Sequence, residues 1–88
     1  FDSKNFINRI NKKDIKISKR FECQINKLNI KEDEFITSLS SLKIIWEISN
    51  PYKYPHPYYF GTIELDQKTY HISFEDGSDR IKMRNFGS

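Results

Sequence analysis

Three residues of this chain have side chains that commonly ligate metals or act as nucleophiles and bases: Cys23, His56 and His71. The two histidines are fifteen residues apart and have no companion Cys or His at ligand spacing, which disfavours a metal site. Cys23 is expected to be a small buried hydrophobe and not the partner of His71 in a nucleophilic pair. The three glycines are too dispersed for a Gly-rich phosphate loop. The sequence therefore predicts no catalytic residue, no metal and no cofactor.

Basic side chains are concentrated in the first third of the sequence. Residues 1–31 contain nine Lys or Arg and three acidic residues, a net charge of +6, whereas the remainder has six basic and nine acidic residues, a net charge of −3. This asymmetry favours a polyanionic partner, and the candidate nucleic-acid contacts are Lys12, Lys13, Lys19 and Arg20. The simpler interpretation is a solvated Lys-rich surface, because no aromatic stacking platform is interleaved with these bases.

Length and composition describe one small domain. The chain has 88 residues, of which 36% are hydrophobic and 31% are charged. A domain of this size buries only about 60–65% of the surface of its unfolded chain, so a deep catalytic cleft is hard to build and a non-enzymatic protein is expected. The longest apolar run, residues 42–46, is interrupted by Lys43, and we expect neither a membrane-spanning segment nor a secretion signal.

In the N-terminal part, the pattern changes from helical spacing to alternation. Phe6, Ile7 and Ile10 suit one or two helical turns. From Asp14 onward, apolar residues alternate with polar ones, which predicts short strands at residues 15–17, 21–25 and 28–30. Residues 31–34 are expected to be a charged break, and residues 35–40 a connector or a single turn.

The second half alternates more clearly, and predicts strands near residues 42–49, 58–65, 69–75 and 79–84. Residues 50–57 contain all three prolines and are expected to form a loop. The dipeptide Asp76-Gly77 is a hairpin signal, because it offers the positive φ angles of tight turns. Four short strands at this spacing predict an all-β fold, a small antiparallel SH3-like barrel over residues 41–86. Residues 1–40 would be a basic N-terminal extension, partly strand.

The strand segments carry a resemblance to a known family. Trp46 in the first strand is followed by YYFGTI at 58–63, YHISFEDG at 70–77 and DRIKMRNF at 79–86. These segments resemble a Tudor domain of the Royal superfamily, most of all the first Tudor module of DNA-damage checkpoint adaptor proteins. The resemblance covers about half of the chain.

The resemblance implies an aromatic cage for methylated lysine. Ring quadrupoles hold a methylammonium cation, and a carboxylate at the rim can accept a hydrogen bond from a remaining N–H. Carried over by position, the cage residues are Trp46, Tyr59, Phe74 and Asp76. Ser78 stands where the relatives place a further aromatic, and that wall could come instead from Tyr52, Tyr54 or Tyr58.

Three functions compete at this point. The resemblance implies a nuclear, chromatin-binding module that reads methylated lysine on a histone tail or another methylated protein. The basic first third, with Arg80, Lys82 and Arg84, would instead suit a barrel that binds DNA or RNA through its phosphates. The third interpretation is an SH3-like protein-interaction module, in which the Tyr-Pro loop at 51–59 forms part of a groove.

Overall fold

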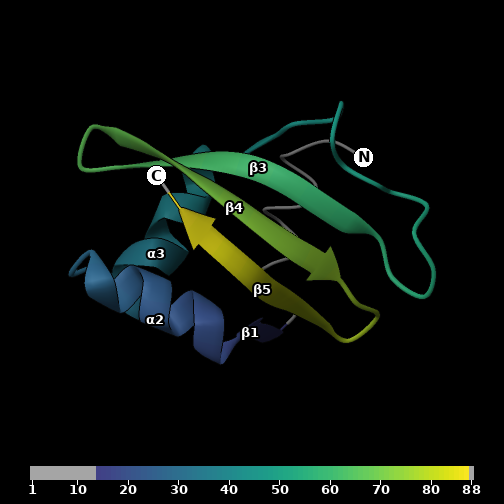
Figure 1. The fold of residues 1–88 in the computed structure, drawn as a ribbon, viewed down its shortest axis with the longest axis horizontal. Coiled ribbons are helices and arrows are strands. Elements are labelled where there is room, and N and C mark those ends of the chain that lie inside the picture. The colour runs from purple at the N-terminus through teal and green to yellow at the C-terminus, as the bar shows by residue number, and fades with distance from the viewer. Residues whose placement is uncertain (1–13, 88) are drawn as a thin grey trace.

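The structure is a computed structural model that describes residues 14–87 (Figure 1). The expected helical turns at Phe6, Ile7 and Ile10 lie outside the described residues. More of the described residues belong to strands than to helices, so the prediction of a β-rich domain is confirmed. The elements in chain order are β1 (Asp14–Ile17), α2 (Lys19–Lys27), α3 (Glu32–Ser38), the short 3-10 helix η1 (Leu39–Ser41), β2 (Lys43–Ile44), β3 (Tyr58–Leu65), β4 (Lys68–Asp76) and β5 (Arg80–Gly87).

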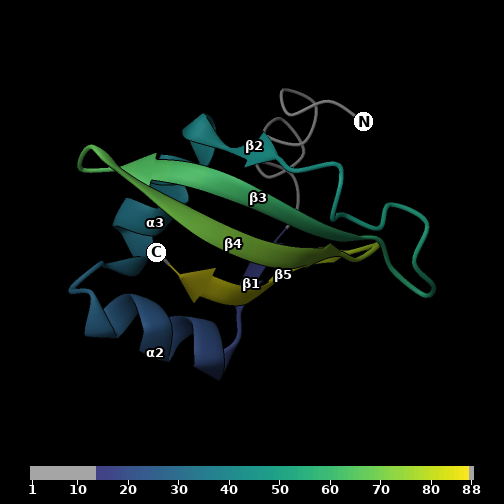
Figure 2. The ribbon, with the colours of Figure 1, turned by 45° about the horizontal axis from the view of Figure 1, so that its top comes forward.

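All five described strands belong to one sheet, in the order β1-β5-β4-β3-β2. Strands β3, β4 and β5 form an antiparallel meander. At its edges, β2 pairs antiparallel with β3 and β1 pairs parallel with β5 (Figure 2). The two edge strands have only four and two residues and do not pair with each other, so the described sheet is open and not a closed barrel.

The strands predicted at residues 21–25 and 28–30 are wrong, because residues 19–27 form helix α2 and Leu28 and Asn29 form a turn after it. Phe21 and Ile25, four residues apart, are buried, whereas Cys23 between them is exposed. The Ser18 Oγ caps the helix by accepting a hydrogen bond of 3.2 Å from the Phe21 N–H. A spacing of four fits both a strand and a helix, and only the exposure of Cys23 separates them. The expectation that Cys23 is buried is wrong for the same reason.

The segment after residue 31 is also more helical than the sequence predicted. Helix α3 continues into η1, so residues 32–41 form a helical unit and not a connector or single turn. The Glu34 Oε1 accepts a hydrogen bond of 3.3 Å from the Lys31 N–H at the start of α3. Phe35 and Leu39, four residues apart, are buried and fix the unit against the core.

The strand predicted at residues 42–49 is reduced to the two residues of β2. Leu42 is buried, but Trp46 and Ile48 are 45% and 57% exposed and belong to a turn. Beside this turn, the Ser49 Oγ donates to the Ile45 carbonyl (2.7 Å) and accepts from the Phe60 N–H (2.9 Å). A side chain thus replaces part of the main-chain ladder on β3, which alternation of apolar residues cannot reveal.

The strand predictions at 58–65, 69–75 and 79–84 are confirmed by β3, β4 and β5, and residues 50–57 form the expected loop. Asp66 and Gln67, at φ of 51° and 67°, make the tight turn between β3 and β4. The positive φ expected at Asp76-Gly77 is wrong, since no glycine in the described range has one. Gly77 instead provides space, because a Cβ there would lie 2.8 Å from the Arg80 carbonyl oxygen.

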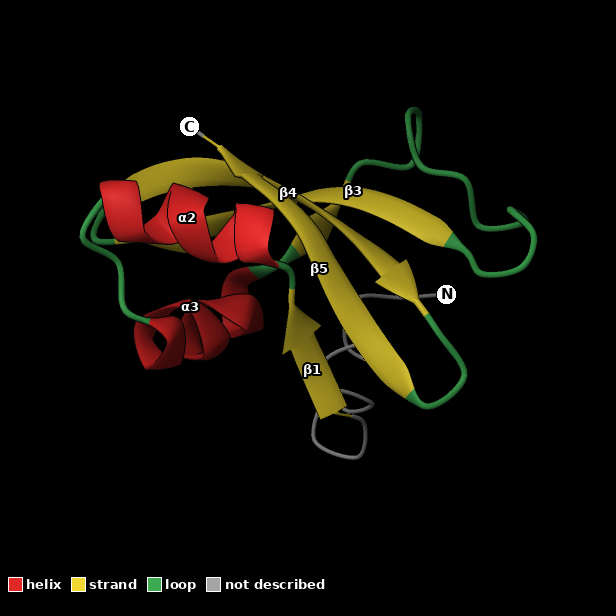
Figure 3. Ribbon diagram, turned by 60° about the horizontal axis from the view of Figure 1, so that its bottom comes forward, coloured by secondary structure: helices red, strands yellow, loops and turns green. Residues whose placement is uncertain are grey.

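One hydrophobic cluster joins the helices to the sheet. The ring centroids of Phe21, Phe35 and Phe86 are 4.8, 5.4 and 6.0 Å apart, with edge-to-face geometry. Figure 3 shows both helices packed together at one end of the sheet. The described part of residues 1–40 therefore shares a core with the strands of residues 41–86. No described helix is long and apolar enough to cross a membrane.

Candidate nucleic-acid interface

The sheet has two faces of different character. The side chains that join the hydrophobic cluster define the core face, which includes Tyr59, Ile63, Ile72 and Phe74. Because successive side chains of a strand point to opposite sides, their neighbours lie on the other side, which we call the open face. The open face contains half-buried or exposed positions of four strands: Lys16, Tyr58, Phe60, Thr62, His71, Glu75, Lys82, Arg84 and Asn85.

Two aromatic rings lie side by side on the open face. Tyr58 and Phe60, two residues apart on β3, have ring centroids 5.3 Å apart at an interplanar angle of 52°. The Lys53 Nζ, from the preceding loop, lies 4.9 Å from the Tyr58 ring centroid, within the range of a cation–π contact. Both rings are half-buried, so part of each remains accessible to a ligand.

A chain of hydrogen bonds holds the Tyr58 ring across the sheet. Its hydroxyl is 3.0 Å from the Ser73 Oγ, which also accepts a hydrogen bond of 3.1 Å from the Asn85 Nδ2. Ser73 is only 2% exposed, so the hydroxyl at the centre of this chain is shielded from water. The ring orientation is therefore set by β4 and β5 and not by β3 alone.

Arg84 reaches the open face because of an irregularity in β5. Phe74 is paired with Met83 but Ser73 is paired with Asn85, so Arg84 is the extra residue of a β-bulge. Its guanidinium donates a hydrogen bond of 2.8 Å to the Glu75 Oε1. With a side-chain exposure of 40%, the guanidinium remains accessible to a ligand while this ion pair orients it.

Two adjoining hollows place basic side chains beside the aromatic pair. The first has a volume of about 380 Å³ and is lined by Ser18, Arg20, Tyr58, Arg84 and Asn85. The second, of about 240 Å³, shares Ser18 and Arg84 with the first. Its other lining residues are Lys16, Lys82 and Met83. Four cations from β1, α2 and β5 thus line the two hollows, the first of which Tyr58 also lines, and Glu75 is the carboxylate paired to one of them.

Of the four proposed cage residues, the three aromatic ones form a series in which the Tyr59 ring contacts the other two. The Trp46 and Tyr59 rings are 6.1 Å apart with edge-to-face geometry, and the Tyr59 and Phe74 rings are 5.5 Å apart. Tyr59, Phe74 and Asp76 are only 4%, 0% and 8% exposed, and belong to the core side of the sheet. Of the four, Trp46 has the most accessible side chain, at 45% exposure.

The further cage candidates are divided between the loop and the sheet. Tyr52 and Tyr54 are 93% and 91% exposed on the loop that precedes β3. Tyr58 is on the open face, opposite Tyr59. The structure therefore separates Tyr58 from the other proposed cage walls.

The basic candidates divide in a similar way. Lys12 and Lys13 lie outside the described residues, and Lys19 and Arg20 are exposed in the first turn of α2. Arg20 lines the first hollow. Sequence reasoning did not assign Phe60, Lys16 or Asn85 to any site. The alternation of β3 could have indicated Phe60, but nothing local marks it as a neighbour of Asn85, which is twenty-five residues later and lines the same hollow.

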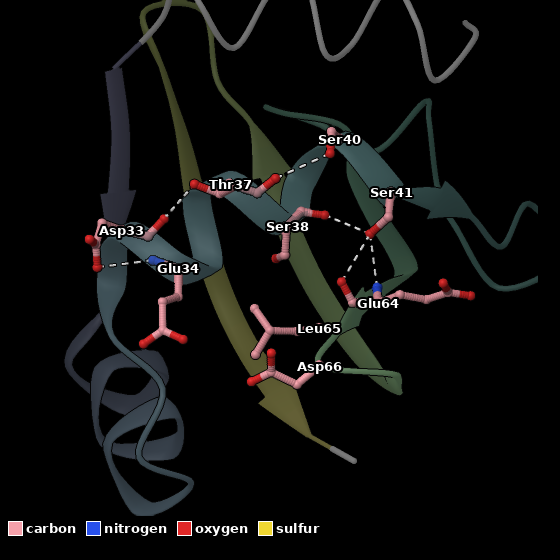
Figure 4. Close-up of a pocket in the computed structure, with 9 residues that line it drawn as sticks. All are labelled: Asp33, Glu34, Thr37, Ser38, Ser40, Ser41, Glu64, Leu65 and Asp66. Carbon is pink, nitrogen blue, oxygen red and sulfur yellow. Dashed lines mark hydrogen bonds between the residues drawn. The ribbon is translucent and has the colours of Figure 1, made fainter.

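An acidic hollow of about 430 Å³ lies elsewhere, between α3 and the turn after β3 (Figure 4). Asp33, Glu34, Glu64 and Asp66 contribute to its lining together with serine and threonine hydroxyls. These hydroxyls serve the fold: the Ser41 Oγ donates to the Ser38 carbonyl (2.6 Å) and accepts from the Glu64 N–H (2.8 Å). The molecule thus has a basic hollow and an acidic one on different elements.

Within residues 14–87, no three His, Cys, Asp or Glu side chains gather in a way that could hold a metal ion. Comparisons with protein-family models, with curated proteins and with solved structures give no match. Function therefore has to be argued from the geometry of the open face.

Proposed function

We propose that this protein binds nucleic acid through the open face of its sheet. The observation that carries the proposal is the first hollow, where Arg20, Arg84 and an aromatic ring, Tyr58, line the same depression. Arginine presents a planar fork of donors that matches phosphate oxygens. The ion pair with Glu75 orients the Arg84 guanidinium and leaves part of it accessible.

Charge supports the same proposal. Lys16 and Lys82 extend the basic surface from the first hollow along the paired strands β1 and β5. A row of cations on adjacent strands can follow a phosphate backbone, and each contact releases condensed counterions. Such contacts give affinity without reading the base sequence. We therefore expect binding that depends strongly on salt and weakly on sequence.

Fluorescence anisotropy with labelled twelve-nucleotide strands tests this function. In Lys82→Gln/Arg84→Gln we expect weaker binding and a plot of log affinity against log salt that is shallower by about 1.4, since each single-strand phosphate contact contributes about 0.7 to the slope. The matched control is Lys27→Gln/Lys68→Gln, which removes two exposed charges from the end of α2 and the tip of a hairpin. The proposal fails if wild type does not bind at low salt, or if both variants weaken binding equally.

Methyl-lysine reading is a second candidate, supported by the contact series Trp46, Tyr59 and Phe74. Under this candidate the protein would be a Tudor-type nuclear reader, and the meander β3–β4–β5 would correspond to strands of an SH3-like barrel. The open sheet and the burial of Tyr59 and Phe74 make it the weaker proposal.

NMR titration with unmodified, mono-, di- and trimethylated lysine peptides tests the second candidate. Trp46→Ala should abolish any selective binding while the fold persists, because Trp46 is 45% exposed. Asp76→Ala should weaken binding of dimethyl-lysine more than that of trimethyl-lysine. Equal shifts with all four peptides would remove this candidate.

A further inference from the structure

We infer that the open face selects single strands and stacks an unpaired base on the Tyr58–Phe60 pair while Arg20 and Arg84 hold an adjacent phosphate. This inference rests on the proposed nucleic-acid function and specifies its ligand. It follows from the position of Tyr58, which lines the same hollow as Arg20 and Arg84 and has the Phe60 ring next to its own.

A base and a phosphate could be held together here. The same hollow is lined by Tyr58, Arg20 and Arg84, so one aromatic residue and two arginines border one space of about 380 Å³. Phe60 enlarges the aromatic surface on the next open-face position of β3, with its ring centroid 5.3 Å from that of Tyr58. Stacking on an aromatic side chain tolerates any base, because every base has a π-face.

Such a platform is of little use for a duplex. In a duplex the base faces are covered by neighbouring bases, and the outer surface presents phosphates and sugars to a protein. Exposing one base face of a duplex requires unpairing and unstacking, which costs free energy. A strand that is already single does not have this cost to the same extent. An aromatic pair between cations therefore favours a strand whose bases are free.

The fold holds the platform in place before a ligand arrives. The hydrogen bonds from Tyr58 through Ser73 to Asn85 fix the ring against β4 and β5. A ring that is already ordered loses little conformational entropy on binding. Lys53, over the Tyr58 ring, adds a cation from the neighbouring loop. The tyrosine hydroxyl thus positions the ring, and the ring makes the contact with the base.

Four eight-nucleotide ligands at constant salt test the inference: oligo(dT), oligo(U), an oligo(dT) strand with central abasic sites, and a duplex of the same length. Wild type should prefer the two intact single strands to the duplex and to the abasic strand by about tenfold, as stacking of one base on an aromatic ring allows. A preference for oligo(U) would assign the site to RNA, and a preference for oligo(dT) to DNA, and both support the inference.

The decisive comparison is between a base-bearing strand and the abasic strand, which has the same phosphates. Tyr58→Ala should lose about tenfold in affinity for oligo(dT) and little for the abasic strand, and Phe60→Ala should behave in the same way. Tyr58→Phe retains the ring and should keep most of the affinity. Thr62→Ala, two residues further along the open face of β3, is the matched control and should bind like wild type. Circular dichroism establishes that each variant is folded.

A strand with one 2-aminopurine gives a second readout, because stacking on a ring quenches its fluorescence. Quenching should be present with wild type and Tyr58→Phe and absent with Tyr58→Ala. If the duplex and the abasic strand bind as well as oligo(dT), and Tyr58→Ala weakens all ligands equally, stacking is wrong while phosphate binding stands. If no ligand binds at low salt, the proposed function itself is wrong.

Discussion

The two faces of the sheet use the same residue types for different purposes, and three consecutive aromatics of β3 illustrate this. Tyr59 points to the core face, where it is 4% exposed and packs on Phe74. Tyr58 and Phe60 point to the open face, where they contact each other, a lysine and a polar chain. The pleat alone separates structural rings from rings available to a ligand.

The largest expected effect compares Phe74 with Phe60. Phe74 is fully buried, and Phe74→Ala should lower the free energy of unfolding by about 3–5 kcal/mol through lost burial and a cavity. Phe60→Ala removes a half-buried ring and should lower it by about 1 kcal/mol, near the value of one aromatic pair. Urea unfolding measures both. Similar losses at the two positions would show that the open face is structural, and would contradict its assignment as a binding surface.

The next effect concerns close packing between β3 and β2. A Cβ at Gly61 would lie 2.7 Å from the Lys43 carbonyl oxygen and 2.9 Å from the Leu42 Cδ1. The first of these is backbone, which cannot move without disturbing the strand pair, so Gly61→Ala should cost about 1–3 kcal/mol in the free energy of unfolding. Thr62→Ala, on the open face, should change it by about 0.5 kcal/mol or less. A Gly61→Ala variant as stable as wild type in urea would show that β2 is not fixed on β3.

A smaller effect is expected at Ser18, which connects helix α2 to the bulged strand. Its Oγ accepts from the Phe21 N–H and donates to the Arg84 carbonyl at 3.3 Å. Ser18→Ala should lower the thermal midpoint, with a loss of about 0.5–2 kcal/mol typical of an N-cap. It should also weaken oligonucleotide binding, because the backbone at Arg84 loses a contact. Ser40→Ala, which removes an exposed hydroxyl in η1, is the control and should alter neither property.

The smallest effect is expected at Lys19, where one substitution should raise stability and weaken binding. Lys19 occupies the first turn of α2, where the helix dipole disfavours a cation. Lys19→Glu should raise the free energy of unfolding by about 0.3–1 kcal/mol and weaken oligonucleotide binding. Lys27→Glu, in the last turn of the same helix, should lower stability and leave binding unchanged. If Lys19→Glu binds as tightly as wild type, the N-terminal end of α2 does not belong to the interface.

Prediction from the sequence was good for the three long strands and failed for the helices and for the short strand β2. The eight or nine residues of β3, β4 and β5 provide enough alternation to fix their limits within a few positions. In α2, Phe21 and Ile25 satisfy both a strand and a helix, and the Ser18 cap that favours the helix was not recognised. Apolar residues continue to alternate as far as Trp46 and Ile48, although strand β2 has ended at Ile44. Beyond the end of β2, the Ser49 hydroxyl and not a main-chain carbonyl accepts the hydrogen bond from the Phe60 N–H of β3.

The candidate site was predicted only as separate parts. The basic residues of the first third and of β5 were recognised, but no aromatic platform was expected near them. Tyr58 is thirty-eight residues after Arg20 in the sequence and meets it only because β3, β4 and β5 are neighbours in the sheet. The bulge that presents Arg84 depends on a register shift between two strands, and no local pattern encodes it.

The sequence by itself determined the β-rich composition, the three long strands, the proline loop and the charge asymmetry, because each depends on local residue type and spacing. The tertiary structure decided the open sheet, the helical conformation of residues 19–27 and 32–41 and the meeting of Tyr58 with Arg20 and Arg84. Strand order and register bring together residues that are distant in the chain. They are set by the burial of one face as a whole, and no segment determines them alone.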